Sequence, residues 1–452
     1  MPVARYKQIV DRVAADIREG RLSPGTRLPA HRTLAREEGV ALVTASRVYA
    51  ELERMGLVSG ETGRGTFVRE TALPAGHGID QPSKQDGVLD LNFNSPSLPG
   101  QTRMLRDALR ELSAAGDLET LLHYQPHAGR RHERGIVARH LQSRGLTVSA
   151  GQVLIVSGAQ HGLATTVMAL LRPGDVVAAD ALIYPGFNVL ADVHRLELAS
   201  VPVVAGYKQG ERTMAPDLDT LEMLCRQRNI RAVYTMPTLH NPLGWVLDYA
   251  QRKRLVDIAR RYDLLIIEDA AYAFHADEPP VPVAAMAPER TIYVSGISKS
   301  IATGLRVGFI AAPAQYVALI ERAVRATTWN TPGLMTKLAC RWIEDGTVAR
   351  LEAEKRADAA TRQKIARQIL KGFDCISHPA AYFIWLLLPE EARADQIVME
   401  LLQANISVST AEPFATTEQA PHALRLALGS VELEALSPAL QKVCDVVGRY
   451  LY

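Results

Sequence analysis

The chain has 452 residues, which is too long for one ordinary domain and predicts two or three. Its 47% hydrophobic and 22% charged residues are normal for a globular protein, and a net charge of +2 excludes a generally basic nucleic-acid coat. The four cysteines show no CxxC spacing, which favours reduced thiols over disulfides or a metal site. The sequence has no charged-then-apolar leader and no apolar run of about 18 residues, so we expect a cytosolic protein that no membrane holds.

The N-terminal residues predict a small helical module with a hairpin. Residues 6–19 carry apolar side chains at helical spacing, and two shorter helices, 33–38 and 44–55, flank a turn at Gly39. Residues 57–59 and 65–68 read as the two strands of a hairpin. In a helix-turn-helix, the first residues of the second helix enter the major groove of DNA, and the hairpin would be a wing beside it.

Several side chains of this module are candidates for DNA contacts. Four arginines are placed to approach phosphates, and Thr44 or Ser46 to reach base edges. The arginines are Arg27, Arg32, Arg47 and Arg64. The alternative is a helical interaction domain whose arginines are only solvated.

Three stretches, 25–35, 48–57 and 63–68, resemble the winged helix of GntR-type transcription factors across nearly all of residues 1–71. The resemblance implies a DNA-binding domain for double-stranded promoter DNA. It has one departure: the family usually carries a Ser-Arg pair just before the recognition helix, where this chain has Ala41 and Leu42. The operator sequence therefore cannot be inherited from relatives.

Residues 72–88 are rich in Gly, Pro and polar residues and predict a linker. Beyond it, apolar strand-like runs alternate with helical patterns, which predicts an α/β domain over 89–452 with a mainly parallel sheet and ligands at the strand ends. The predicted strands are 153–156, 176–179, 232–236, 264–267, 291–294 and 307–311. From about Glu352 a long charged helix and strands at 382–388 and 424–428 predict a smaller α/β subdomain.

Lys299 follows an apolar run and Ser298, and Arg306 comes seven residues later. A strand that delivers a Ser-Lys pair suits a lysine that forms a Schiff base with a phosphorylated aldehyde such as pyridoxal 5'-phosphate (PLP), and the arginine suits the phosphate dianion. Taken alone, a lysine after a strand is an ordinary surface residue.

PLP chemistry also needs a carboxylate against the ring nitrogen, phosphate donors and a stacking ring. Asp269 ends the most apolar run and suits the nitrogen, with a helix N-cap as the alternative. Tyr272 and Asn241 suit the phenolic oxygen, although Asn-Pro is also a common turn. Tyr184 suits stacking on the ring, with a core tyrosine as the alternative.

The remaining candidates serve anions. Gly158, Ala159 and Gln160 lie between a strand and a helix expected near His161, where backbone N–H groups bind phosphate. Arg425 lies in an apolar strand and suits an effector carboxylate, with a surface salt bridge as the alternative.

The order and spacing of these residues resemble the fold type I aminotransferases from about Leu89 to Tyr452. The resemblance implies PLP as cofactor, the roles just given, and a homodimer in which Tyr124 reaches the phosphate of the partner subunit. There are two departures. Gly296 stands where the family usually has a phosphate-binding Ser or Thr, with Ser295 one place earlier, and Ala380-Ala381 replace a Gly-Gly pair. We expect a lost or rerouted phosphate bond and a narrower ligand space.

Together the winged helix, linker and aminotransferase-like domain resemble the MocR/GabR class of bacterial transcription regulators. The resemblance implies a head-to-tail homodimer that senses PLP, or a small amine or amino acid forming an aldimine with it, and then changes its promoter binding. The alternative is an aminotransferase acting on an amino acid with an accessory DNA-binding module, which the enzyme-like pattern Asn241-Pro242-Leu243-Gly244 favours. A third hypothesis is a sequence-independent DNA-binding scaffold whose aminotransferase-like domain is degenerate.

Overall fold

The computed structural model describes residues 5–18, 21–23, 25–54, 57–61, 65–69, 87–114, 118–208, 211–389, 392, 394–417 and 420–450. They form two compact units, one from the N-terminal residues up to 77 and one mainly from those that follow. Among the described residues, no helix combines the length and the apolar character needed to cross a membrane.

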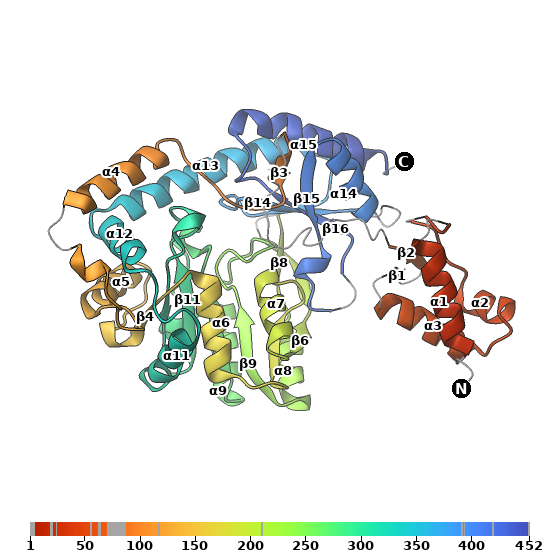
Figure 1. Cartoon of the computed structure of the whole chain (residues 1–452), viewed down its shortest axis with the longest axis horizontal. Helices are drawn as coiled ribbons and strands as arrows, with labels where there is room; N and C mark the ends of the chain where they lie inside the picture. Colours follow the sequence, from red (N-terminus) through yellow and green to blue (C-terminus); the bar gives the residue numbers. More distant parts are fainter. Residues whose placement is uncertain are drawn as a thin grey trace. The chain divides into compact units, whose positions relative to one another are not determined.

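The N-terminal unit is a three-helix bundle with a small hairpin (Figure 1). Helices α1 (Arg5–Arg18) and α2 (His31–Glu37) both pack on α3 (Leu42–Arg54), around a core that includes Val48 and Leu52. Strands β1 (Val58–Glu61) and β2 (Gly65–Val68) pair in antiparallel fashion. The predicted winged helix is therefore confirmed, although α2 and α3 each begin two residues earlier than expected. The predicted wing turn at Gly63 and Arg64 lies outside the described residues.

The second unit is built on a seven-stranded sheet of order β4-β12-β11-β10-β9-β5-β6. Only β12 runs antiparallel to its neighbours among these described strands, so the sheet is mainly parallel, as predicted. Its strands are β4 (Val153–Val156), β5 (Val176–Asp180), β6 (Glu197–Val201), β9 (Ile230–Thr235), β10 (Leu265–Asp269), β11 (Thr291–Gly296) and β12 (Gly308–Ala311).

Helices cover both faces of this sheet, because successive strand residues point to opposite sides and both sides are apolar. In β4, for example, Leu154 and Val156 face one core while Val153 and Ile155 face the other. The helices on the first side are α6 (Ala159–Leu170), α7 (Pro185–Val193) and α11 (Ala314–Thr327). Those on the second are α5 (Arg131–Gln142), α8 (Leu218–Gln227), α9 (Tyr249–Arg261), α10 (Val283–Met286) and α12 (Gly333–Glu344).

A five-stranded sheet of order β13-β14-β16-β15-β3 forms the smaller subdomain. Its strands are β3 (Leu89–Leu91), β13 (Cys375–Ile376), β14 (Phe383–Leu387), β15 (Ile406–Thr410) and β16 (Ala423–Ala427). Strand β3 joins it from the far end of the domain by pairing in parallel with β15. Helices α13 (Thr347–Ile369), α14 (Ala394–Gln403) and α15 (Leu433–Gly448) belong to this region (Figure 1), and α13 begins before the predicted start at Glu352.

The other described elements lie outside these two sheets. They are α4 (Gln101–Ala114), the hairpin β7 (Val203–Lys208) and β8 (Glu211–Pro216), and short 3-10 helices at Glu119–Leu121, Ala150–Gln152, Ala273–His275, Thr303–Leu305 and Glu412–Phe414.

Candidate functional site

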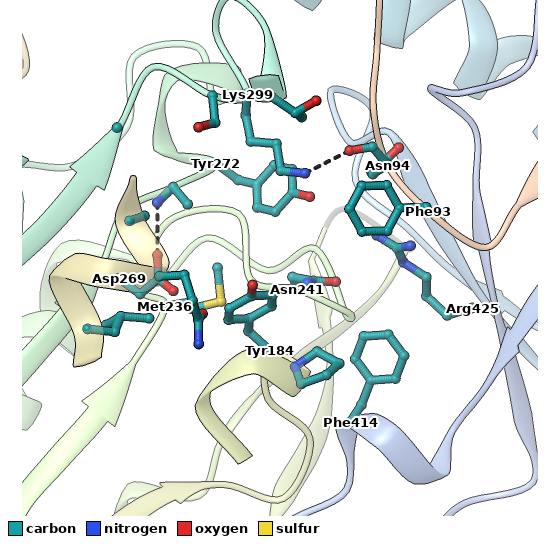
Figure 2. Close-up of a pocket in the computed structure, with 18 of the residues that line it drawn as sticks. Phe93, Asn94, Tyr184, Met236, Asn241, Asp269, Tyr272, Lys299, Phe414 and Arg425 are labelled. Carbon is teal, nitrogen blue, oxygen red and sulfur yellow. Dashed lines mark hydrogen bonds between the residues drawn. The ribbon is translucent and has the colours of Figure 1, made fainter. Parts of the chain in front are cut away.

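The ends of β9, β10 and β11, with the starts of α6 and α7, surround a pocket of about 280 Å³. Ten predicted site residues line it: Ala159, Gln160, Tyr184, Asn241, Asp269, Tyr272, Ser298, Lys299, Arg306 and Arg425. In Figure 2, Asp269 lies on one side and Phe93 and Arg425 on the other, with Tyr184 and Asn241 between them. The fold thus brings together ten of the twelve residues predicted for the cofactor and the effector, whereas Gly158 and Tyr124 are not among the described lining residues.

Lys299 reaches into the pocket from the loop that follows β11 (Figure 2). Its Nζ donates to the main-chain carbonyl of Asn94 at 2.7 Å, and it lies 5.3 Å from the ring centroid of Phe93 and 5.7 Å from that of Tyr272. The amine is therefore held in the pocket by a backbone acceptor and two aromatic rings.

Asp269 ends β10 and is buried. Its carboxylate accepts from the Tyr234 hydroxyl at 2.9 Å and from the Ala271 N–H at 3.0 Å. Burial raises the pKa of Asp269 to about 6, and these two donors oppose the rise. A nearby cation or N–H⁺ group would stabilise the carboxylate further.

A cradle of backbone forms where β4 meets α6. Gly158 has a φ of +92° at the start of α6, and a Cβ on it would come within 2.8 Å of Arg306 Nη2. A Cβ on Gly308 would come within 2.6 Å of the Gly158 carbonyl carbon. Arg306, whose guanidinium donates to the Ser157 carbonyl at 3.4 Å, therefore lies against the N-terminus of α6. A cation beside helix N–H groups is an arrangement that binds phosphate.

Arg425 is buried on β16 and also faces the pocket. Its Nη1 donates to the Asn92 carbonyl at 2.8 Å, and its guanidinium carbon lies 5.2 Å from the Phe383 ring and 5.9 Å from the Phe414 ring. Burial lowers the pKa of Arg425 from its ordinary value, while Tyr272 and Asp90 oppose this. Since its Nε has no hydrogen-bond partner among the described residues, the Nε–H can still donate a hydrogen bond to a bound anion.

The structure shows where the residues lie that depart from the aminotransferase pattern. Ser295 does not replace the missing phosphate donor, because it points away from the pocket and donates to the Ala270 carbonyl at 3.1 Å. Gly296 lines the pocket, and a Cβ there would come within 2.9 Å of the Val307 carbonyl oxygen. Neither Ala380 nor Ala381 is among the described lining residues, so the expected narrowing of the ligand space stays a prediction.

Tyr124 is the predicted cofactor residue that lies away from the pocket. It is 85% exposed, and its ring lies 5.5 Å from that of Trp329. The resemblance assigns it to the site of a partner subunit, so this role stays a prediction.

Sequence reasoning missed the segment after β3 and one buried lysine. Asn92, Phe93 and Asn94 all line the pocket, and the first and third hold Arg425 and Lys299 through their carbonyls. Polar residues that directly follow the Leu89–Leu91 strand were the available signal. Met236 and Phe414, which also line the pocket, had no comparable signal.

The missed lysine is Lys355 on α13, which is fully buried. Its Nζ donates to the carbonyls of Pro96, Lys299 and Ile301 at 2.9–3.0 Å. Burial, and then the charge of Lys299, lower the pKa of Lys355 to about 7. Lys355 therefore ties the loop of the pocket lysine to the segment after β3.

The predicted DNA contacts lie on the N-terminal unit. Arg27 and Arg32 are exposed, Arg27 beside β2 through its backbone bridge to Phe67 and Arg32 on α2. Thr44 is half-buried in the first turn of α3. Arg64 lies outside the described residues.

Two of the candidates on α3 have partners within the unit. Ser46 Oγ lies 3.1 Å from His31 Nδ1. Arg47 donates to the Tyr6 hydroxyl at 3.2 Å and lies 4.1 Å above the centre of that ring. Their roles in DNA contact stay predictions.

Comparison with known proteins identifies both units. Residues 86–443 match the family described as aminotransferase class I and II, and residues 5–68 match bacterial regulatory proteins of the gntR family. The chain belongs to the aminotransferase class I and II family. Joined to a gntR-family unit, its aminotransferase class I and II domain gives the chain the architecture of the MocR class, whose cofactor is PLP.

Relatives of this aminotransferase-family chain include regulators and enzymes. The uncharacterized HTH-type transcriptional regulator YdeF of Bacillus subtilis is 28% identical over 92% of this chain and 88% of its own. The uncharacterized HTH-type transcriptional regulator YjiR of Escherichia coli is 25% identical over 99% of this chain and 99% of its own. The 2-aminoadipate transaminase of Thermus thermophilus is 26% identical over 80% of this chain and 90% of its own.

Solved structures confirm the fold of the aminotransferase-family domain. The kynurenine aminotransferase of Pyrococcus horikoshii superposes with a TM-score of 0.74 at 21% identity, over 82% of this chain and 93% of its own.

The pocket of this aminotransferase-family chain fits PLP. Three buried polar atoms on predicted cofactor residues have no hydrogen-bond partner among the described residues: Gln160 Oε1, Asn241 Oδ1 and Ser298 Oγ. Buried polar groups normally find partners, so a polar ligand that reaches them is favoured. A cationic cradle at Arg306 and a buried carboxylate at Asp269 match the phosphate and the ring nitrogen.

Proposed function

We propose that this protein is a PLP-dependent, DNA-binding transcription regulator whose promoter binding changes when PLP, or an amino compound that reacts with it, occupies the pocket. The observation that carries the proposal is one chain that joins a gntR-family unit to a pocket lined by ten of the residues predicted to bind a cofactor or an effector. Relatives described as HTH-type transcriptional regulators cover 92–99% of the chain and support it.

The pocket residues take the following roles in this proposal. Arg306, Gly158, Ala159 and Gln160 hold the phosphate at the start of α6, and Ser298 adds a hydroxyl. Asp269 keeps the ring nitrogen protonated, Asn241 and Tyr272 bind the ring hydroxyl, and Tyr184 stacks on the ring. Bound PLP supplies an aldehyde that condenses with amines and a ring that withdraws electrons.

The chain's own groups then select the ligand. The Lys299 amine lies in the pocket, where it donates to the Asn94 carbonyl. The Arg425 guanidinium, which lies near the rings of Phe383 and Phe414, can bind a carboxylate of the ligand. An amino compound with a carboxylate is therefore the favoured effector class. Such a ligand alters DNA binding only if it binds two arrangements of the protein unequally.

A homodimer, with its subunits head to tail, belongs to this proposal. Leu122 is 84% exposed beside the exposed Tyr124, whose ring approaches Trp329, and exposed apolar groups that cluster in this way favour an interface. Two DNA-binding units per dimer require an operator with two half-sites. A regulator of promoters acts where the chromosome lies, so we propose a cytoplasmic location.

The experiment follows DNA binding and bound PLP in one cuvette. The full chain is titrated with PLP and then with amines and amino acids, in the presence of a labelled duplex from a candidate promoter. The proposal expects the DNA affinity to change at the ligand concentrations that change the visible absorbance of the protein. Absorbance changes that leave DNA affinity constant for every ligand, and for PLP itself, contradict it.

Lys299→Ala is the key variant. Because no other described lysine lines the pocket, we expect it to lose visible PLP absorbance on dialysis. Lys253→Ala, which removes an exposed lysine paired with Asp257 at 2.7 Å, is the control and should retain the absorbance. Colour that survives dialysis in Lys299→Ala overturns the assignment of the lysine.

A working aminotransferase is the second candidate, because Arg425 and Asn241, which opens an enzyme-like Asn-Pro-Leu-Gly pattern, both line the pocket. Sustained turnover of an amino acid and a keto acid, at about 1 per second or faster, would favour the enzyme. A slow half-reaction that stops after one amino group has been transferred per pocket would favour the regulator.

A further inference from the structure

The first turn of α3 presents an apolar surface to solvent. Leu42 is 48% exposed and Val43 is 80% exposed. Among the described residues before 70, they are the large apolar side chains that are exposed. Adjacent exposed apolar side chains favour a site of interaction, and the partner at such a site must itself offer an apolar group.

Packing within the unit does not account for these two side chains. The buried stripe of α3 runs through Ala45, Val48, Tyr49 and Leu52, at helical spacing. Val43 lies off that stripe, and Leu42, three residues before Ala45, lies at its exposed end, so both side chains remain largely open to solvent.

Two polar residues that follow them on α3 already have partners in the unit. Ser46 lies against His31, and Arg47 lies against Tyr6. The first turn can therefore offer a partner mainly the side chains of Leu42, Val43 and the half-buried Thr44.

The partner that fits is the major groove of DNA. In a helix-turn-helix the N-terminal residues of the second helix contact base edges there, and α3 is that helix in the gntR-family unit. The C5-methyl group of thymine is the apolar group that this groove presents, whereas guanine offers acceptors that suit an arginine. Exposed Arg27 and Arg32 on neighbouring segments supply the positive charge that phosphates require.

We infer that Leu42 and Val43 read thymine methyl groups, so that T·A pairs are preferred where the first turn of α3 meets the groove. The inference rests on the proposed DNA-binding function and adds the chemistry by which the sequence is read. It makes Val43, the more exposed of the two, a specificity-determining residue.

The test uses the full chain and its own preferred duplex, obtained by selection from random DNA. Each thymine of that duplex is then replaced by uracil, which removes one methyl group and keeps the base-pairing groups. Loss of one methyl contact corresponds to about fourfold in affinity, so we expect at least one thymine in each half-site to show about this effect. In Val43→Ala or Leu42→Ala, the ratio of thymine to uracil affinity at that position should fall to about one.

Arg32→Ala is the matched control, because an exposed arginine outside the first turn of α3 should weaken both duplexes alike and leave the ratio unchanged. Circular dichroism checks that the alanine variants fold, which their exposure predicts. A selected duplex that binds equally well with uracil throughout overturns the inference. A thymine-to-uracil affinity ratio that stays near four in both alanine variants also overturns it. Dissociation of the dimer by Val43→Ala in the absence of DNA would overturn it too, because Val43 would then serve an interface between subunits. Failure to select any duplex overturns the proposed function instead.

Discussion

The pocket of the larger unit and the surface of the N-terminal unit hold their candidate residues in different ways. Pocket residues come from distant segments and bond to one another, as when Arg425 donates to the Asn92 carbonyl across 333 positions. The DNA-contact candidates come from residues 27–64, and Arg27, Arg32 and Arg47 are exposed. Substitutions in the pocket should therefore cost both stability and ligand binding, whereas those on the N-terminal surface should cost affinity alone.

Lys355→Met tests the pocket side of this comparison most severely. It leaves three carbonyls without a donor, and each such loss costs about 1–3 kcal/mol, so we expect the free energy of unfolding to fall by about 4 kcal/mol. Urea unfolding of the full chain measures it. Lys364→Met, which changes an exposed lysine on the same helix, should leave the midpoint unchanged. Equal midpoints for the two variants would show that the tie at Lys355 has no energetic role.

Asp269→Asn should change how the cofactor-free protein responds to pH. The native pKa of Asp269 is raised to about 6, so between its unfolded value and 6 the native state holds a proton that the unfolded state has released. Stability from this proton is present at low pH and is lost as pH rises. From about pH 4 to about pH 7, wild type should lose about 2 kcal/mol relative to Asp269→Asn.

Unfolding midpoints of the two proteins across this pH range measure the difference. Saturating PLP should reduce the loss in wild type, because a protonated ring nitrogen favours the carboxylate. Parallel pH profiles for the two cofactor-free proteins would contradict the raised pKa.

Leu122→Asp tests the proposed interface beside Tyr124. Burying a leucine stabilises an interface by about 1.5–3 kcal/mol, so the dimer dissociation constant should rise at least about tenfold. Sedimentation velocity measures the change. Val193→Asp, on α7 and 67% exposed, is the matched control and should leave the association unchanged. A monomeric wild type, or equal effects of the two variants, would remove the interface.

Arg32→Ala completes the comparison with the smallest expected change in stability. An exposed arginine on α2 should alter the free energy of unfolding by less than about 0.5 kcal/mol. If it contacts a phosphate, the slope of log affinity against log salt concentration should fall by about one unit per site. A large loss of stability in this variant would break the proposed contrast between the two regions.

The parts of the fold that the sequence predicted well are those set by local patterns. The three helices of the N-terminal unit follow from apolar spacing, and six of the seven strands of the larger sheet follow from short apolar runs, whereas the edge strand β6 was not predicted. The same rule located Asp269, Lys299 and Asn241, because side chains at the ends of parallel strands gather at one edge of the sheet.

The features that were missed depend on contacts between distant segments. Strand β3 has three residues and gains its place by pairing with β15, so its local pattern is too short to predict a strand by itself. Lys355 is a charged residue in a charged helix and reads as a surface lysine until the carbonyls of Pro96, Lys299 and Ile301 surround it. A lost or rerouted phosphate bond was expected at Gly296, and the neighbouring Ser295 is turned away from the pocket by alternation along β11.

The close approach of Gly158 and Gly308 limits how this protein can diverge. A methyl group at position 308 would overlap the main chain at Gly158, and β12 cannot shift to make room without losing register with both β4 and β11. Homologous chains that keep this cradle should therefore retain both glycines together, even where the surrounding side chains have been exchanged freely.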